Sequence, residues 1–171
     1  MIEQSPHVQL AMAAIREYVE LGSMLRLAAD LPEDLAQPAA SFVSLKKGAE
    51  LRGCIGTIEP TQPTLAEEIL INAISAATRD PRFPPVEPKE LDFLACSVDV
   101  LSPPEEIPDE GMLDPIRYGV IVQCESRRGL LLPNLEGVDT VELQLDIARR
   151  KGFIPLDEKV RLFRFEVKRF Y

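Results

Sequence analysis

The stretch Leu51-Arg52-Gly53-Cys54-Ile55-Gly56-Thr57 is central to the interpretation of this chain, because it places a thiol between two glycines, next to an arginine, in an apolar run. Glycine lets a ligand or another chain segment approach the backbone closely. Cysteine can act as a nucleophile, and a neighbouring guanidinium favours the thiolate. The same pattern is typical of a small core residue in a bulged strand, since free cysteines are often buried.

The residues around this stretch predict a hairpin followed by a helix. Residues 40–45 and 51–58 form two apolar runs separated by a turn at residues 46–50. Thr64-Leu65-Ala66-Glu67 is a capping-box sequence, which predicts a helix from Leu65 to about Arg79. The other elements expected in this half are a helix from Pro6 to Gly22, a connection at residues 31–38 with at most one helical turn, and a strand at residues 96–101.

The second half repeats this order of elements. A β-branched run at residues 119–124, a turn at 126–129 and a short strand at 130–132 predict a second hairpin. A helix with an acidic start at Asp139-Thr140 and an end before Gly152 follows, and residues 160–170 alternate as a half-buried strand. Arg52-Gly53 in the first half therefore corresponds in position to Arg128-Gly129 in the second. The repeated order indicates a duplicated unit, and the alternative is that the order of elements is the same by chance.

A duplicated ββαβ unit predicts an α+β fold with two related lobes that share one mixed, curved sheet, with the helices packed outside. The 171 residues fit a single domain. We place lobe one at about residues 1–102 and lobe two at about 112–171, joined by an acidic, proline-rich connection at 103–111.

Composition excludes several classes of protein. The chain has 46% hydrophobic and 27% charged residues, which is ordinary for a globular protein, and no apolar stretch long enough to cross a membrane. The net charge of −9 weighs against a nucleic-acid binder. Three widely spaced cysteines and a single histidine give neither a zinc site nor a disulfide framework, so we expect no metal and a cytoplasmic location.

The central stretch is the first of three candidate sites. As a functional site it would use Cys54 as a nucleophile or thiol ligand and Arg52 as an anion clamp, while Gly53, Gly56 and Thr57 leave room for a substrate. Nucleophilic catalysis also needs a general base. His7 is far away in the sequence, where we expect it exposed near a helix start, so Glu59 or Asp80 would have to replace it.

The second candidate site is residues 79–85, Arg-Asp-Pro-Arg-Phe-Pro-Pro. Prolines stiffen this loop, so that Asp80, Arg82 and Phe83 are presented in fixed directions just after a helix end. The alternative is a stiff connector in which Phe83 anchors the loop and Asp80 pairs with an arginine. The third candidate, Arg127-Arg128-Gly129, is usually just a basic hairpin turn and less often an anion site.

Four segments carry a family resemblance in their order and spacing: residues 51–57 (LRGCIGT), 80–85 (DPRFPP), 98–104 (VDVLSPP), and 119–122 with 129–133 (GVIV and GLLLP). They resemble the AMMECR-type domain, called AmmeMemoRadiSam system protein A in bacteria and archaea, from about Leu10 to Phe170. The resemblance implies a cleft near the Arg-Gly-Cys segment, a cytoplasmic role and a gene-neighbourhood link to Memo-like and radical S-adenosylmethionine proteins. It implies no established reaction, and residues 43–47 lack the histidine that many relatives carry.

We therefore expect a binding or accessory protein of unassigned reaction, which presents Arg52 and Arg82 to a small anionic ligand or a partner segment. One alternative is an enzyme that uses Cys54 with Asp80 as its base or orienting group. The other is a purely structural interaction scaffold. The sequence indicates no cofactor, and it leaves the reaction, the ligand and the oligomeric state open.

Overall fold

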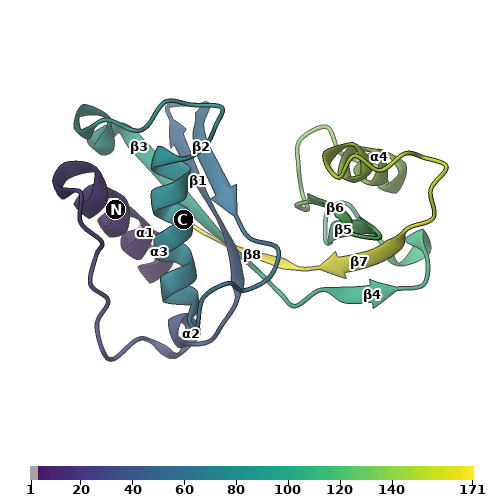
Figure 1. Ribbon diagram of the computed structural model, residues 1–171, viewed down its shortest axis with the longest axis horizontal. Helices are drawn as coiled ribbons and strands as arrows, with labels where there is room; N and C mark the ends of the chain where they lie inside the picture. The colour runs from purple at the N-terminus through teal and green to yellow at the C-terminus, as the bar shows by residue number, and fades with distance from the viewer. Residues whose placement is uncertain (1–3) are drawn as a thin grey trace. The chain divides into compact units, whose positions relative to one another are not determined.

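The computed structural model describes residues 4–171 and contains two compact units. The first unit comprises the chain up to Val100 together with Lys168–Tyr171, and the second comprises Leu101–Val167. Each unit contains one four-stranded sheet with helical structure packed on it (Figure 1). The α+β class is confirmed. The expectation of one shared sheet is corrected, because the strands form two separate sheets with the orders β2-β1-β3-β8 and β4-β7-β5-β6.

In the first unit, two long helices cover one face of the sheet. The buried core joins Ile15 of α1 and Ala73 of α3 to Val43 of β1 and Val98 of β3. Within residues 4–171, no helix of the first unit covers the opposite face of this sheet (Figure 1). The elements are α1 (Pro6–Leu21), α2 (Glu33–Ala36), β1 (Ala40–Lys47), β2 (Glu50–Gly56), α3 (Leu65–Thr78), the 3-10 helix η1 (Pro88–Phe93), β3 (Leu94–Leu101) and β8 (Val167–Phe170).

Local capping fixes the helix ends of the first unit as the sequence predicts. The side chain of Ser5 accepts the backbone N–H of Val8 at the start of α1, and Gly22 ends the helix in the left-handed conformation with φ of 69°. Thr64 caps α3 by accepting the N–H of Glu67. These ends depend on neighbours in the sequence, which explains why they could be predicted.

The second unit packs one helix on its sheet, with Val120, Val122 and Ala148 in the shared core. The predicted turn at residues 126–129 is wrong, because Glu125 adopts a φ of 53° and lets β6 begin at Arg127. The expected connection at residues 103–111 contains a short strand and a 3-10 turn. The elements are β4 (Glu105–Ile107), η2 (Glu110–Met112), β5 (Gly119–Cys124), β6 (Arg127–Leu131), α4 (Val141–Lys151) and β7 (Arg161–Phe165).

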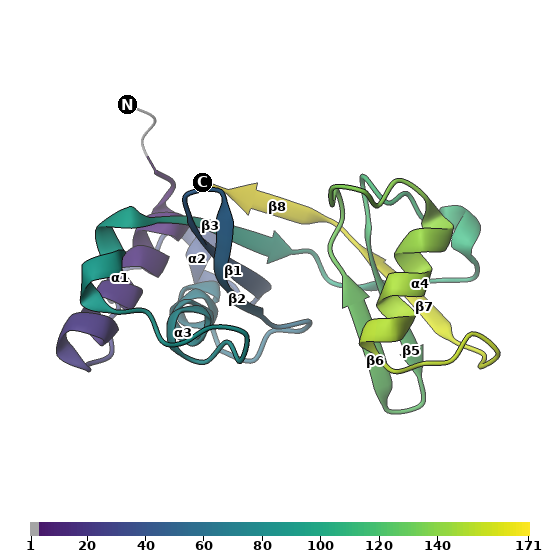
Figure 2. The same ribbon diagram turned by 90° about the horizontal axis from the view of Figure 1, so that it is seen from above.

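The last strand is divided between the two sheets. Instead of one strand over residues 160–170, β7 ends at Phe165 and β8 begins at Val167 (Figure 2). At the break, the N–H of Glu166 donates to the hydroxyl of Ser102 at 2.8 Å, and Glu166 O accepts the N–H of Ser102 at 2.9 Å. The alternating sequence continues through this point, so only the tertiary pairing separates the two strands.

The two hairpin-helix pairs share one packing geometry. A Cβ atom on Gly53 would lie 2.2 Å from the carbonyl oxygen of Ala76 in α3, and one on Gly129 would lie 1.7 Å from that of Ala148 in α4. Only glycine allows so close an approach of strand and helix. Four residues before each alanine, a buried amide bonds the start of the hairpin: Asn72 donates to Ser41 O at 2.9 Å, and Gln144 donates to Tyr118 O at 2.8 Å. This correspondence supports the predicted duplication.

Candidate functional site

Cys54 lies on the face of the first sheet that the helices leave open. Side chains alternate along β2, so Gly53 faces α3 and Cys54 points the other way. Ser44 of β1 is its cross-strand partner, and the Ser44 hydroxyl donates to Cys54 Sγ at 3.1 Å. The thiol is half-buried. In the second unit Leu130 follows the corresponding glycine, so the thiol is a feature of the first hairpin.

The Asp80 carboxylate binds the free edge of β2. Cys54 N donates to Asp80 Oδ2 at 2.9 Å, and Arg82 Nη2 donates to Cys54 O at 3.3 Å. Since β2 is an edge strand, these two side chains satisfy backbone groups that a neighbouring strand would otherwise bind. Sequence analysis predicts a site at Asp80 and Arg82, and the structure brings both residues to Cys54.

Asp80 and Arg82 form a tightly bonded pair. Arg82 Nη2 lies 2.7 Å from Asp80 Oδ2, Arg82 Nε donates to Asp80 Oδ1 at 3.0 Å, and the Arg82 N–H also donates to Oδ1 at 3.1 Å. The Asp80 side chain is only 2% exposed. Hydrogen bonds from the Arg82 guanidinium hold the pKa of Asp80 well below its usual range, against the opposing effect of burial. Asp80 is therefore a poor proton acceptor at neutral pH.

Arg82 is fixed on one side and open on the other. Its side chain is 55% exposed, and its guanidinium lies 5.5 Å from the ring centroid of Phe83. Within residues 4–171, Nε and Nη2 carry all of its side-chain hydrogen bonds, so Nη1 is left to donate elsewhere. A guanidinium held in this way presents a preorganised donor to a carboxylate or phosphate group.

Arg52 holds the loop after α3 against the sheet. It donates to Glu90 from Nε at 3.1 Å and from Nη2 at 2.9 Å, and from Nη1 to Pro84 O at 3.0 Å. These hydrogen bonds from Arg52, with smaller contributions from the Glu87 N–H and from Lys47, lower the pKa of Glu90 to about 2. The structure thus gives Arg52 protein partners, and its side chain is 13% exposed.

Thr57 and Gly56 also have local structural partners. The Thr57 hydroxyl donates to Glu68 Oε1 at 2.6 Å, and the same buried carboxylate accepts the backbone N–H groups of Thr61 and Gln62. A Cβ on Gly56 would lie 2.2 Å from the Phe42 ring, so glycine is needed for that ring to cover the strand. Both residues shape the end of β2 beside Cys54.

His7 is buried, which corrects the expectation of an exposed residue. It is 2% exposed and stacks on Phe170 of β8 with ring centroids 3.7 Å apart. Its Nε2 lies 3.7 Å from Asp34 Oδ2, and burial lowers its pKa. The aromatic partner from the last strand explains the burial, and sequence spacing gives no sign of that contact. His7 therefore anchors the C-terminal strand to α1.

The other two cysteines lie in different surroundings. Burial raises the pKa of Cys96 to about 12. Cys124 donates to Glu158 Oε2 at 2.9 Å, and this hydrogen bond raises the pKa of its thiol. Arg127 pairs with the same carboxylate, although Arg128 is the residue that corresponds to Arg52 in the sequence. Among the described residues, no three or more histidine, cysteine or acidic side chains gather where they could hold a metal ion.

Sequence analysis missed three residues that shape this region. Ser44 lies opposite Cys54, Glu90 binds Arg52, and Glu68 binds Thr57. The pairing register of β1 and β2 would have identified Ser44 as the residue opposite Cys54. The two glutamates are 38 and 11 residues from their partners, and acidic residues on helices are ordinarily exposed, so nothing in the local sequence marks them.

Several known proteins are similar to this chain in sequence or structure. The family model AMMECR1 matches residues 8–170. A protein from Thermotoga maritima is 53% identical over 99% of both chains, and one from Methanothermobacter thermautotrophicus is 42% identical over 96% of this chain and 91% of its own length. The crystal structure of an uncharacterized protein from Pyrococcus horikoshii superposes with a TM-score of 0.88 at 35% identity, covering 95% of this chain and 88% of that one.

One relative is much longer than this chain. A protein from Clostridium acetobutylicum is 46% identical over 98% of this chain, which corresponds to 36% of its own length. The matched region is therefore one part of a longer chain in that organism. No helix within residues 4–171 combines the length and apolar character that a membrane crossing requires.

Proposed function

The chain belongs to the AMMECR1 family, and on that premise we propose that it is a binding or accessory protein and not a self-sufficient enzyme. Arg82 receives an anionic group of a small ligand or of a partner segment, beside Cys54 and Ser44. The partners in this proposal are Memo-like and radical S-adenosylmethionine proteins, and the location is cytoplasmic. The Clostridium relative supports an accessory role, because there the matched region is part of a larger protein.

One observation carries the proposal: Asp80 and Cys54 O hold the Arg82 guanidinium, while Nη1 makes no hydrogen bond within residues 4–171 and the side chain is 55% exposed. Holding the guanidinium in place lowers the entropy lost when an anion binds. The thiol lies next to this donor, because Arg82 bonds the carbonyl of the same residue. Cys54 would then contact the ligand without reacting with it.

Neither Asp80 nor His7 is placed to act as the proton acceptor that the enzyme alternative needs. Asp80 is bonded to Arg82 and to Cys54 N, and its pKa is held low. His7 is buried against Phe170. Nucleophilic catalysis by a thiol usually relies on an adjacent base or on a specific activating charge. Asp80 fits a positioning role in the binding site better than a role as general base.

The proposal is tested by an NMR titration of the isotope-labelled protein with inorganic phosphate at constant ionic strength. We expect the amide signals of Cys54 and Phe83 to shift, with the Kd raised about tenfold or more in Arg82→Ala, as for loss of a charge-assisted hydrogen bond. Cys54→Ser should keep the affinity. Arg79→Ala is the matched control, because it removes a nearby exposed charge that makes no side-chain bond to β2.

The outcome decides between the alternatives. Shifts at Cys54 that persist unchanged in Arg82→Ala, or an absence of shifts at phosphate concentrations up to the solubility limit, would refute anion binding at this position. Native mass spectrometry of protein purified from its own cells adds a second readout. A bound anion or a co-purifying partner that is lost in Arg82→Ala supports the proposal, and the same species retained in Arg82→Ala contradicts it.

A further inference from the structure

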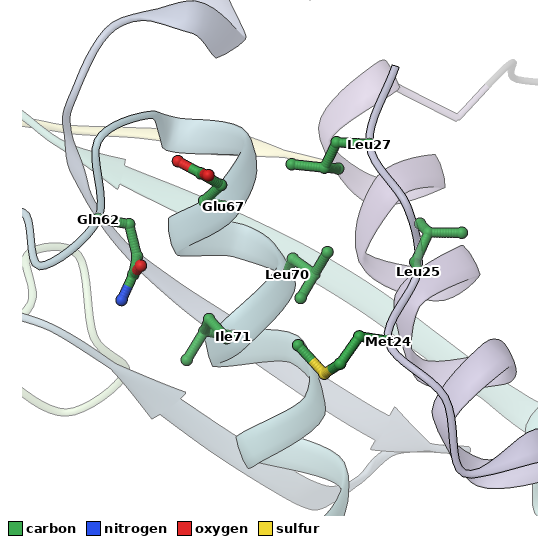
Figure 3. Close-up of a pocket in the computed structure, with 7 residues that line it drawn as sticks. All are labelled: Met24, Leu25, Leu27, Gln62, Glu67, Leu70 and Ile71. Carbon is green, nitrogen blue, oxygen red and sulfur yellow. The ribbon is translucent and has the colours of Figure 1, made fainter. Parts of the chain in front are cut away.

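An apolar groove lies on the helical side of the first unit, and its lining contains none of Cys54, Asp80 and Arg82. A groove of about 330 Å³ runs over α3 and is shown in Figure 3. Met24, Leu25 and Leu27 lie on one side of α3, and Gln62 lies on the other. The residues that line the groove are Met24, Leu25, Leu27, Gln62, Glu67, Leu70 and Ile71. The volume is that of a site for one or two side chains or a small molecule.

The segment that follows α1, residues 24–31, borders this groove and is held by apolar contacts alone. Leu25 and Leu27 pack against Leu70 and Ile74 of α3. None of its backbone or side-chain groups forms a hydrogen bond or an ion pair with another described residue. We call residues 24–31 the strap. Its backbone N–H and C=O groups need partners outside the described structure, which solvent or a second chain can supply.

The groove has an exposed apolar surface. Met24 is 50% exposed and Ile71 is 36% exposed. Methionine adapts to partners of different shape because it is unbranched and polarizable. Clustered exposed side chains of this kind mark interaction surfaces more often than isolated ones do.

Charge selects the kind of occupant. Glu67 is the charged residue in the lining of this groove. One of its carboxylate oxygens accepts the Thr64 hydroxyl at 3.0 Å, and within residues 4–171 the other accepts no hydrogen bond. An anion in this groove would meet the carboxylate of Glu67, so a cation beside an apolar group is the complementary ligand.

We infer that this groove binds a segment of a partner protein in which a lysine or arginine adjoins a large aliphatic side chain. The aliphatic side chain packs between Met24 and Ile71, the cation pairs with Glu67, and the partner backbone bonds to the strap. Extended segments bind other proteins in this way, with main-chain hydrogen bonds for affinity and side-chain pockets for specificity. The unbonded strap backbone favours such a segment over a small amine, which could use only the carboxylate and the apolar floor.

The test uses two matched peptides, acetyl-Leu-Lys-Leu-amide and acetyl-Leu-Glu-Leu-amide, titrated into protein with labelled methionine methyl groups and backbone amides. We expect the basic peptide to shift the Met24 methyl, the strap amides and the Ile71 amide, and the acidic peptide to leave them unchanged. Glu67→Gln should raise the Kd of the basic peptide about two- to fivefold, as for a half-exposed ion pair. Glu50→Gln is the control, because Glu50 is an exposed carboxylate in β2.

Several results would overturn the inference. Equal affinity for the two peptides would contradict the proposed ion pair with Glu67. An unchanged Kd of the basic peptide in Glu67→Gln would contradict it as well. Shifts of the same size with n-butylammonium alone would assign the groove to a small amine. An Ile71→Ser variant tests the apolar contact. It should lower the affinity for the basic peptide, and an unchanged affinity would contradict the proposed packing. Because none of these residues contacts Arg82, failure here leaves the anion-binding proposal standing.

Discussion

The backbone N–H of Cys54 donates to Asp80 Oδ2 at 2.9 Å, across 26 residues of sequence. This bond joins the thiol-bearing edge strand to the loop that follows α3. Together with the hydrogen bond from Arg82 to Cys54 O, it gives β2 the partners that a further strand would supply. Sequence analysis left two roles open for residues 79–85, a binding loop or a stiff connector. The hydrogen bonds of Asp80 hold the loop to β2, as expected for a connector. The exposed side chain of Arg82 supports a binding role.

Replacement of Asp80 by alanine should destabilise the first unit by about 2–4 kcal/mol, because it leaves Cys54 N–H without its acceptor and Arg82 without its buried partner. The free energy of unfolding is measured by urea denaturation. Arg79→Ala is the control and should change it by less than about 0.5 kcal/mol. A loss in Asp80→Ala no larger than in this control would show that the edge of β2 does not depend on the carboxylate.

Acid should destabilise the protein through the same carboxylates. The pKa values of Asp80 and Glu90 are lowered in the folded state, Glu90 to about 2, so the unfolded chain takes up protons first as the pH falls. Their stabilising contribution is present above the unfolded pKa values near 4 and is lost as the pH falls from there towards the folded pKa values. Urea midpoints measured from pH 7 to pH 2.5 report this loss.

A matched pair of variants isolates the contribution of Glu90 to the acid response. Glu90→Gln should be less stable than wild type at pH 7 and should lose less stability on acidification, because the titrating group that bonds Arg52 is gone. Glu50→Gln, at an exposed position, should keep the wild-type slope. An acid slope in Glu90→Gln equal to that of wild type would contradict the assignment.

The two close-approach glycines should be the least replaceable glycines in the chain. In Gly53→Ala and Gly129→Ala the added methyl would overlap the carbonyl oxygens of Ala76 and Ala148, so helix and strand must separate. We expect losses of about 3 kcal/mol or more, at the upper end for overpacking. Gly137→Ala meets no atom within 4 Å and is strained only by its φ of 78°, so it should cost about 1 kcal/mol. Thermal and urea unfolding of the three variants measure the loss of stability in each. A smaller loss in Gly53→Ala than in Gly137→Ala would contradict this prediction.

The three thiols should differ in reactivity in the native protein. Cys54 is partly accessible, whereas burial raises the pKa of Cys96 to about 12 and the hydrogen bond to Glu158 raises that of Cys124. Iodoacetamide at pH 8 should therefore alkylate Cys54 about tenfold or more faster than the other two. Peptide mass mapping over time measures the three rates. Comparable rates at all three positions would mean that local opening, and not the native surroundings, controls access.

Much of the fold follows from local sequence. Ser5, Gly22 and Thr64 mark helix ends through contacts with residues three or four positions away, so these ends were predictable. The candidate site was predictable in part, because Cys54, Asp80 and Arg82 belong to unusual local patterns. Their mutual contact was not, since it depends on where the loop after α3 lies along β2.

The sequence by itself determined the α+β class, the two hairpin-helix pairs and the family, because these depend on short-range periodicity, capping and motifs. Only the tertiary structure decided that the last alternating segment divides between two sheets, and that Arg52 binds Glu90 across 38 residues. The physical reason is the same in each case. Backbone and charged groups pair with whichever partners the packed chain brings near, and residues that are distant in sequence leave no local sign of that choice.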